Sequence, residues 1–177
     1  MSKPPDEMRT KDRRPDQYFN PDESLFRRIP IWMWEDPADR PGPEAVELPD
    51  MSVGRSKYGH AEWVRFDVLN NRYFEDWGIL AFRVEDIPPQ YWQLGVYKFT
   101  FTPTHDPLEK DYPHTEVRVY NNGEHIKLSE ALPEDIHLKW RLALLQVMDP
   151  IVKPNQKIPI REKAPVSHKL EPHRVVD

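Results

Sequence analysis

The stretch "DYPHTEVRVYNNGEHIKL" (residues 111–128) decides the fold class of this chain. Two runs of alternating polar and apolar residues flank Asn122-Gly123, a dipeptide strongly favoured in two-residue hairpin turns. Counted outward from this turn, Arg118 faces Lys127 across the predicted hairpin. Because successive side chains of a strand point to opposite faces, one face of the hairpin is apolar and the other carries ionisable groups.

The polar face of this hairpin is the first candidate site. It carries His114, Glu116, Arg118, Tyr120, His125 and Lys127. A carboxylate and an imidazole among cations can act as general base and acid, while the cations neutralise a developing anion. We therefore take Glu116 and His114 as catalytic candidates and Arg118 and Lys127 as substrate-binding candidates. The same alternation is the ordinary pattern of a sheet with one solvated face, which stays an open alternative.

The composition bounds the class of protein. A length of 177 residues suits one domain, and 20 prolines against 6 glycines with 38% apolar residues favour a compact middle with polar ends. A net charge of −5 argues against a sequence-independent nucleic-acid binder. The absence of cysteine excludes disulfides and thiolate chemistry. The sequence has neither an apolar run of membrane-spanning length nor a signal peptide, which favours a cytoplasmic protein without a membrane partner.

Proline and charge divide the chain into three parts. Residues 1–23 offer almost nothing to bury and predict an extended or disordered tail. Residues 150–177 carry a proline every few positions, which predicts a second extended, proline-rich tail. Residues 24–149 then form a single domain.

Hydrophobic patterns within this domain predict an α+β fold. Strands are expected at 25–34, 77–84 and 96–102, and Pro30 favours an edge position or an interruption for the first. Apolar residues at helical spacing predict one long helix that ends at Asp149-Pro150, and a second helix is expected near 59–69. The predicted architecture is a small, mostly antiparallel sheet of four to five strands with one long helix packed on it.

Three residues far apart in the sequence define a second candidate site. Arg27 or Arg28 on an early strand, Ser52 in the middle and Glu116 on a late strand occur in an order that resembles ADP-ribosyltransferase-like folds. The resemblance implies that the arginine holds the phosphates of NAD, the serine orders the site and the glutamate grips the nicotinamide ribose. Arg28, Ser52 and the nearby Arg55 are thus substrate-binding candidates. The alternative is that residues 48–60 form an ordinary basic loop.

Metal-dependent chemistry is a weaker alternative. Imidazoles and carboxylates that could hold Zn²⁺ or Fe²⁺ lie close together in the sequence, but at no recognised spacing: His105, Asp106, Asp111, His114, Glu116 and His125. Asp106 or Asp111 followed by Glu116 and Arg118 approximates a restriction-type nuclease, yet arginine replaces the lysine that such sites use. We therefore predict no metal ligands and no cofactor, with NAD or a divalent metal as the alternative.

Aromatic residues beside prolines point to a partner. Trp32, Trp34, Tyr91 and Trp92 lie in segments with little capacity to bury them, and such residues are enriched at protein interfaces. The sequence therefore favours a small soluble binding or assembly subunit whose proline-rich tails and loop aromatics engage a protein partner. The alternative is an enzyme that acts on a nucleotide or NAD-like phosphorylated substrate at the polar face of the hairpin.

Overall fold

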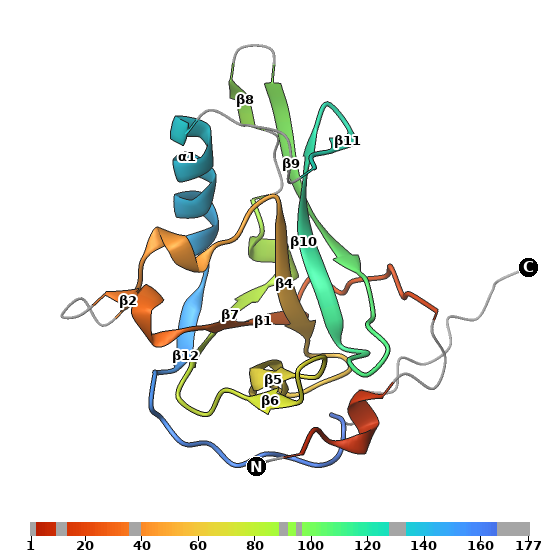
Figure 1. Ribbon diagram of the computed structural model, residues 1–177. Helices are drawn as coiled ribbons and strands as arrows, with labels where there is room; N and C mark the ends of the chain where they lie inside the picture. Colours follow the sequence, from red (N-terminus) through yellow and green to blue (C-terminus); the bar gives the residue numbers. More distant parts are fainter. Residues whose placement is uncertain are drawn as a thin grey trace, which may run out of the picture.

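The protein forms a mostly antiparallel sheet with one α-helix beside it (Figure 1). The computed structural model describes residues 3–9, 14–35, 40–88, 92–94, 97–127 and 134–165. Within these residues, seven strands follow one another in the order β12-β7-β1-β4-β10-β9-β8, and β11 pairs with β10. The α+β prediction is confirmed, but the sheet is larger than the four to five strands expected. The strands are β1 Ser24–Ile29, β4 Asp50–Arg55, β7 Gly78–Arg83, β8 Trp92–Leu94, β9 Tyr97–His105, β10 His114–Asn121, β11 Glu124–His125 and β12 Asp149–Val152.

Several short elements lie outside this sheet. Two short ribbons pair β2 with β3 and β5 with β6. The remaining elements are β2 Trp34–Glu35, β3 Arg40–Pro41, β5 Phe66–Asp67, β6 Arg72–Tyr73, the 3-10 turns η1 Asp6–Met8, η2 Ile31–Met33, η3 Pro43–Ala45, η4 Ala61–Arg65 and η5 Val84–Asp86, and the helix α1 Glu134–Leu145. Among the described residues, no helix has the length and apolar character needed to cross a membrane.

The hairpin turn forms as the sequence predicts. Asn122 and Gly123 both adopt positive φ angles, 51° and 84°, as a two-residue hairpin turn of this kind requires. The ladder then stops after two residue pairs, because β4 takes over the edge of β10. Arg118 therefore lies opposite Asp50 of β4, and the predicted pairing of two cations, Arg118 with Lys127, does not form.

The two faces of the sheet differ in chemistry. On one face, alternate residues of β1, β4 and β10 are buried in the main hydrophobic core. The helix α1 supplies Trp140 and Leu144 to this core, and the rings of Phe99 and Trp140 lie 4.0 Å apart. The other face carries the intervening polar residues and is partly covered by η4. This second face holds the candidate site.

Three sequence predictions of local structure are corrected. The stretch 48–60, expected to be a loop, contains β4 in the middle of the sheet. Of the two alternatives for the first strand, the edge position is wrong, because β1 lies between β7 and β4, whereas the interruption is found: β1 ends at Ile29, directly before Pro30. The helix expected near 59–69 is a 3-10 turn of five residues, η4.

The described parts of both terminal segments pack on the body. Met8 is buried, and β12 adds the start of the expected C-terminal tail to the sheet. Pro150 is accommodated there because β12 is an outer strand with a register shift. The following residues run beneath β5 and β6 (Figure 1), where the carbonyl of Arg161 accepts a hydrogen bond from Trp63. Residues 149–152 are therefore part of the sheet.

Candidate functional site

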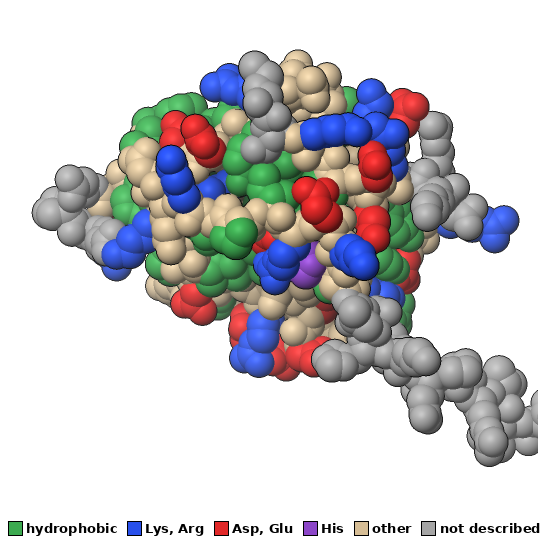
Figure 2. Space-filling view, turned by 90° about the horizontal axis from the view of Figure 1, so that it is seen from below, with side chains coloured by type: hydrophobic (Ala, Val, Ile, Leu, Met, Phe, Trp, Pro, Cys, Tyr) green, Lys and Arg blue, Asp and Glu red, His purple; other side chains and the backbone are tan. Residues whose placement is uncertain are grey.

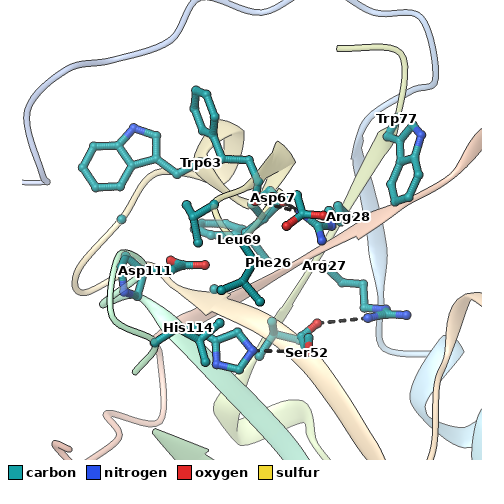
Figure 3. A pocket seen from close by; sticks show the side chains of 18 of the residues that line it. Phe26, Arg27, Arg28, Ser52, Trp63, Asp67, Leu69, Trp77, Asp111 and His114 are labelled. Atoms are coloured by element: carbon teal, nitrogen blue, oxygen red, sulfur yellow. Dashed lines mark hydrogen bonds between the residues drawn. The ribbon is translucent and has the colours of Figure 1, made fainter. Parts of the chain in front are cut away.

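A cavity of about 460 Å³ lies on the polar face of the sheet (Figure 3). Strands β1, β4 and β10 form one wall, and η2, η4, residues 66–70 and residues 108–113 contribute to the others. Aromatic side chains contribute to its lining, among them those of Phe26, Phe66 and Trp77. The chemically active groups around it are Arg28, Ser52, Asp67, Asp111 and His114.

Arg28 enters the cavity from β1. Its Nη1 donates hydrogen bonds to the carbonyl oxygens of Val64 (3.1 Å) and Phe66 (2.7 Å). Its guanidinium carbon also lies 5.0 Å from the ring centroid of Phe74 and 5.8 Å from that of Trp77. These contacts fix the orientation of the guanidinium. Within the described residues no acceptor bonds Nε or Nη2, so both groups can donate to a ligand.

Ser52 and His114 face the cavity from neighbouring strands. The His114 Nε2 atom lies 3.3 Å from Ser52 Oγ, and its Nδ1 lies 2.7 Å from the backbone oxygen of Asp106. A carbonyl oxygen only accepts hydrogen bonds, so Nδ1 carries a proton, and in the neutral form of the ring Nε2 presents its lone pair to the serine. The hydroxyl of Ser52 then donates to the imidazole.

Two carboxyl groups on the cavity wall have opposite pKa shifts. Burial raises the pKa of Asp111 to about 6, although the charges of His114 and Arg28 partly oppose this rise. For Asp67, burial also opposes ionisation, but hydrogen bonds from Asn70 and the charge of Arg28 hold the pKa below its ordinary value. One carboxyl is thus partly protonated near neutral pH and the other is ionised, so the cavity wall carries both an acid and a base.

Glu116 and Arg118 lie beside the cavity rather than in its lining. Glu116 is the direct cross-strand partner of Ser52, but its Oε2 accepts hydrogen bonds from Arg118 Nε (2.9 Å) and Nη2 (2.7 Å). Arg118 Nη2 also donates to the carboxylate of Asp106 at 2.7 Å. Lys127 follows β11 and does not line the cavity either. The structure therefore gathers Arg28, Ser52 and His114 at the cavity, whereas Glu116, Arg118 and Lys127 do not line it.

Arg55 contributes to the cavity wall, but its guanidinium is engaged elsewhere. It is fully buried and makes two hydrogen bonds to the carboxylate of Glu23, at 2.7 and 2.9 Å. It also donates to the backbone oxygens of Asp16 and Tyr18, and its carbon lies 3.9 Å from the ring centroid of Phe19. These contacts attach the N-terminal segment to the sheet. We do not retain Arg55 as a ligand-binding residue.

The partner-binding candidates occupy different environments. Trp32 is 72% exposed at the rim of the cavity, with its ring edge-on to Trp77 at 5.6 Å. Trp34 packs against the main core. Tyr91 and the side chain of Trp92 lie outside the described residues. Figure 2 shows the end of the molecule that carries β5 and β6, where acidic and basic side chains mix around hydrophobic ones.

The residues of the alternative metal site occupy different environments. His105 is buried, accepts a hydrogen bond from the backbone nitrogen of Asp16 and contacts the carbonyl of Tyr112, whereas His125 pairs with Asp50. Within the described part of the chain, no group of three or more His, Asp or Glu side chains is placed to hold a metal ion.

Comparison with known proteins adds no relative. No family model, no curated protein and no solved structure matches this chain. The functional argument therefore rests on the geometry of the cavity. Sequence reasoning missed Asp67 and the aromatic lining, because they meet the polar strands only through the fold and carry no local pattern.

Proposed function

We propose that the protein is an enzyme that binds a nucleotide or a similar phosphorylated aromatic compound in this cavity. The observation that carries the proposal is the convergence of Arg28, Ser52, Asp111 and His114 around one aromatic-lined space. Its volume of about 460 Å³ lies within the range of small-molecule sites. Sites that combine a few polar groups with perturbed pKa values are the usual locations of ligand binding and catalysis.

Arg28 is the anchor for the phosphate group. Two backbone carbonyls hold one edge of its guanidinium, and the donors Nε and Nη2 on another edge form the fork that matches two phosphate oxygens. Because this long side chain is already ordered in the free protein, binding a ligand costs less side-chain conformational entropy.

The aromatic rings accommodate the base of the ligand. Phe26 and Trp77 contribute to the lining of the cavity, and aromatic faces stack on nucleobases without requiring a particular sequence. Asp111 accepts or donates a hydrogen bond according to its protonation state, since its pKa is raised to about 6. The cavity thus provides stacking, charge neutralisation and proton transfer for one ligand.

Only part of the resemblance to ADP-ribosyltransferase-like sites supports this proposal. Arg28 and Ser52 line the same cavity, but the carboxylate of Glu116 is engaged by Arg118. We therefore propose no contact between Glu116 and a ribose. NAD⁺ remains one ligand to test among nucleotides.

A binding experiment tests this function. Thermal unfolding and calorimetry of the full chain are measured with AMP, ATP, NAD⁺, inorganic phosphate and the corresponding nucleosides. A nucleotide is expected to raise the melting temperature, because a ligand that binds only the folded state stabilises it by about 2.7 kcal/mol at 100 times Kd. Arg28→Lys should weaken binding about tenfold or more, since a hydrogen bond to a charged group contributes about 1.5–3 kcal/mol.

The matched control is Arg83→Lys on β7, an arginine that does not line the cavity. It should bind the nucleotide as the wild type does. If none of the nucleotides shifts the melting temperature, or if Arg28→Lys and Arg83→Lys bind equally well, the proposal fails.

A second candidate function, binding of a protein partner, is supported by the exposure of Trp32. Its side chain is 72% exposed beside Ile31, which is 43% exposed. Rigid exposed aromatics of this kind serve as anchors at interfaces. Trp32→Ala should abolish co-elution with such a partner in size-exclusion chromatography, whereas Leu69→Ala, which removes another exposed apolar side chain, should not. Equal co-elution of both variants would exclude Trp32 as the anchor.

A further inference from the structure

We infer that Ser52 is a nucleophile activated by His114, and that the enzyme passes through a covalent intermediate in which Ser52 carries a phosphoryl group. The inference deepens the proposed function and takes its substrate class, a phosphate ester or anhydride, from it. The observation behind it is independent of that function: an imidazole held between a backbone carbonyl and a serine hydroxyl at a cavity wall.

The register of the sheet creates the pair. Ser52 lies opposite Glu116, and His114 lies opposite Gly54, so the serine and the histidine are diagonal neighbours on the same face of β4 and β10. Figure 3 shows the imidazole directed at Ser52 across the floor of the cavity. Their separation of 3.3 Å is long for a hydrogen bond, as is common for catalytic pairs without substrate.

The Nδ1 atom of His114 has a closer hydrogen-bond partner than Nε2. His114 Nδ1 lies 2.7 Å from the carbonyl oxygen of Asp106, and the carboxylate of Asp106 is bonded to Arg118, which also holds Glu116. The ion pairs beside the cavity thus fix the carbonyl that orients the imidazole. A nucleophile, a base and a group that orients the base form the general arrangement of nucleophilic catalysis.

A merely structural role does not account for this pair. Ser52 is an exposed residue on the solvent side of an inner strand, and both side chains line the cavity. The backbone groups of β4 and β10 already pair with one another, so the sheet does not need the hydroxyl. Arg28, which has free donors, lines the same space and can neutralise the oxygens of a phosphate under attack.

The chemistry balances without a metal or a redox partner. Ser52 Oγ attacks the phosphorus of the substrate, the Oγ–P bond forms and the bond between phosphorus and the leaving oxygen breaks. The electron pair of that bond stays on the leaving oxygen. The proton of Ser52 moves to His114 Nε2 and from there to the leaving oxygen. Water then attacks the phosphorus, the Oγ–P bond breaks, and the proton taken from water by His114 returns to Oγ.

A fluorophosphonate probe tests the nucleophile without the natural substrate. Such a probe presents phosphorus with a fluoride leaving group, so an activated serine displaces fluoride and gains the phosphonyl mass. The full chain is incubated with the probe, and the adduct is located by intact mass and peptide mapping. We expect one adduct, on Ser52. His114→Gln should slow labelling about 100-fold or more, since a positioned base typically contributes about 10²–10⁴.

Two controls separate activation from simple exposure. Ser24→Ala removes a hydroxyl for which the described residues show no imidazole partner, and it should label at the wild-type rate. Ser52→Ala should lose the adduct while retaining the far-ultraviolet circular dichroism of the wild type. If Ser52→Ala does not fold, the peptide map of the wild-type adduct decides the question by itself.

The outcomes distinguish this inference from the proposed function. Nucleotide binding without an adduct on Ser52 would overturn the nucleophile and leave the proposed function standing. An adduct on Ser52 in a protein that binds neither nucleotides nor phosphate would support the nucleophile and exclude the substrate class. Labelling that is unchanged in His114→Gln, or spread equally over other serines, would contradict activation by His114.

Discussion

Asp111→Asn should stabilise the protein at neutral pH, which is unusual for a substitution at a cavity wall. Burial raises the pKa of Asp111 from 3.8 to about 6 in the folded protein. Between these two values the folded state binds a proton that the unfolded chain has already lost. Stability therefore falls as the pH rises through this window. Asparagine has nearly the same shape but never ionises, so it removes this loss.

The size of the effect follows from the pKa. One pKa unit corresponds to about 1.4 kcal/mol, so a rise from 3.8 to about 6 makes the ionised carboxylate cost about 3 kcal/mol above pH 6. At pH 4.5 the unfolded chain is mostly ionised and the folded state is not, which leaves a difference of about 1 kcal/mol. A gain of 3 kcal/mol at neutral pH corresponds to about 6–12 °C in melting temperature for a chain of this size.

Urea denaturation at pH 4.5, 6.0 and 7.5 measures this difference. The free energy of unfolding of Asp111→Asn should exceed that of the wild type by an amount that grows with pH. Asp76→Asn, at an exposed aspartate, corrects for the general effect of removing one negative charge. A gain that is the same at all three pH values, or a loss at pH 7.5, would refute the argument that burial of the carboxylate is the cause.

Three further predictions concern the framework around the cavity. Arg55→Met should destabilise the fold by about 3–5 kcal/mol in urea, because it leaves Glu23 buried and unpaired; a change below 1 kcal/mol would contradict the buried pair. Gly54→Ala places a Cβ 2.6 Å from Val64 Cγ1 and should cost about 1–3 kcal/mol in thermal unfolding, with recovery when Val64 is also shortened to alanine. Glu62→Gln should accelerate proteolysis within 153–165, since its carboxylate holds that segment; unchanged cleavage would exclude this role.

Local signals in the sequence predict the hairpin turn and the helix α1 correctly. The turn at Asn122-Gly123 requires left-handed φ angles, which these residues adopt most easily, and both have them. The helix α1 buries Trp140 and Leu144, two of the residues whose spacing predicts it. In both cases the deciding interactions lie within a few residues along the chain.

Long-range pairing is what the sequence does not reveal. Residues 48–60 contain no run of β-branched residues, yet β4 lies between β1 and β10 because its neighbours supply partners from far along the chain. The pairing of β4 with β10 also determines the candidate site. It brings Ser52 beside His114, and it occupies the edge of β10 at which Lys127 was expected to pair. The sheet register therefore determines which polar candidates meet.

A comparison of three arginines supports the proposal that the cavity is a ligand site. Arg27 and Arg55 are buried, and backbone oxygens and carboxylates occupy their guanidinium groups: Arg27 bonds the oxygens of Ala45 and Ser52 and pairs with Glu47. A buried charge ordinarily has all its donors engaged in hydrogen bonds or ion pairs in this way. Arg28 lies on the adjacent position of the same strand and is held by carbonyl oxygens on one edge only.

The open edge of Arg28 has a physical consequence. A guanidinium with free donors in an aromatic-lined space contributes less to stability than a saturated one, and the neighbouring carboxyl of Asp111 reduces stability when it ionises. An arginine with free donors and a carboxyl whose ionisation is unfavourable therefore line one cavity. A phosphate supplies acceptors to the free donors of Arg28, so inorganic phosphate should raise the melting temperature of the wild type more than that of Arg28→Lys.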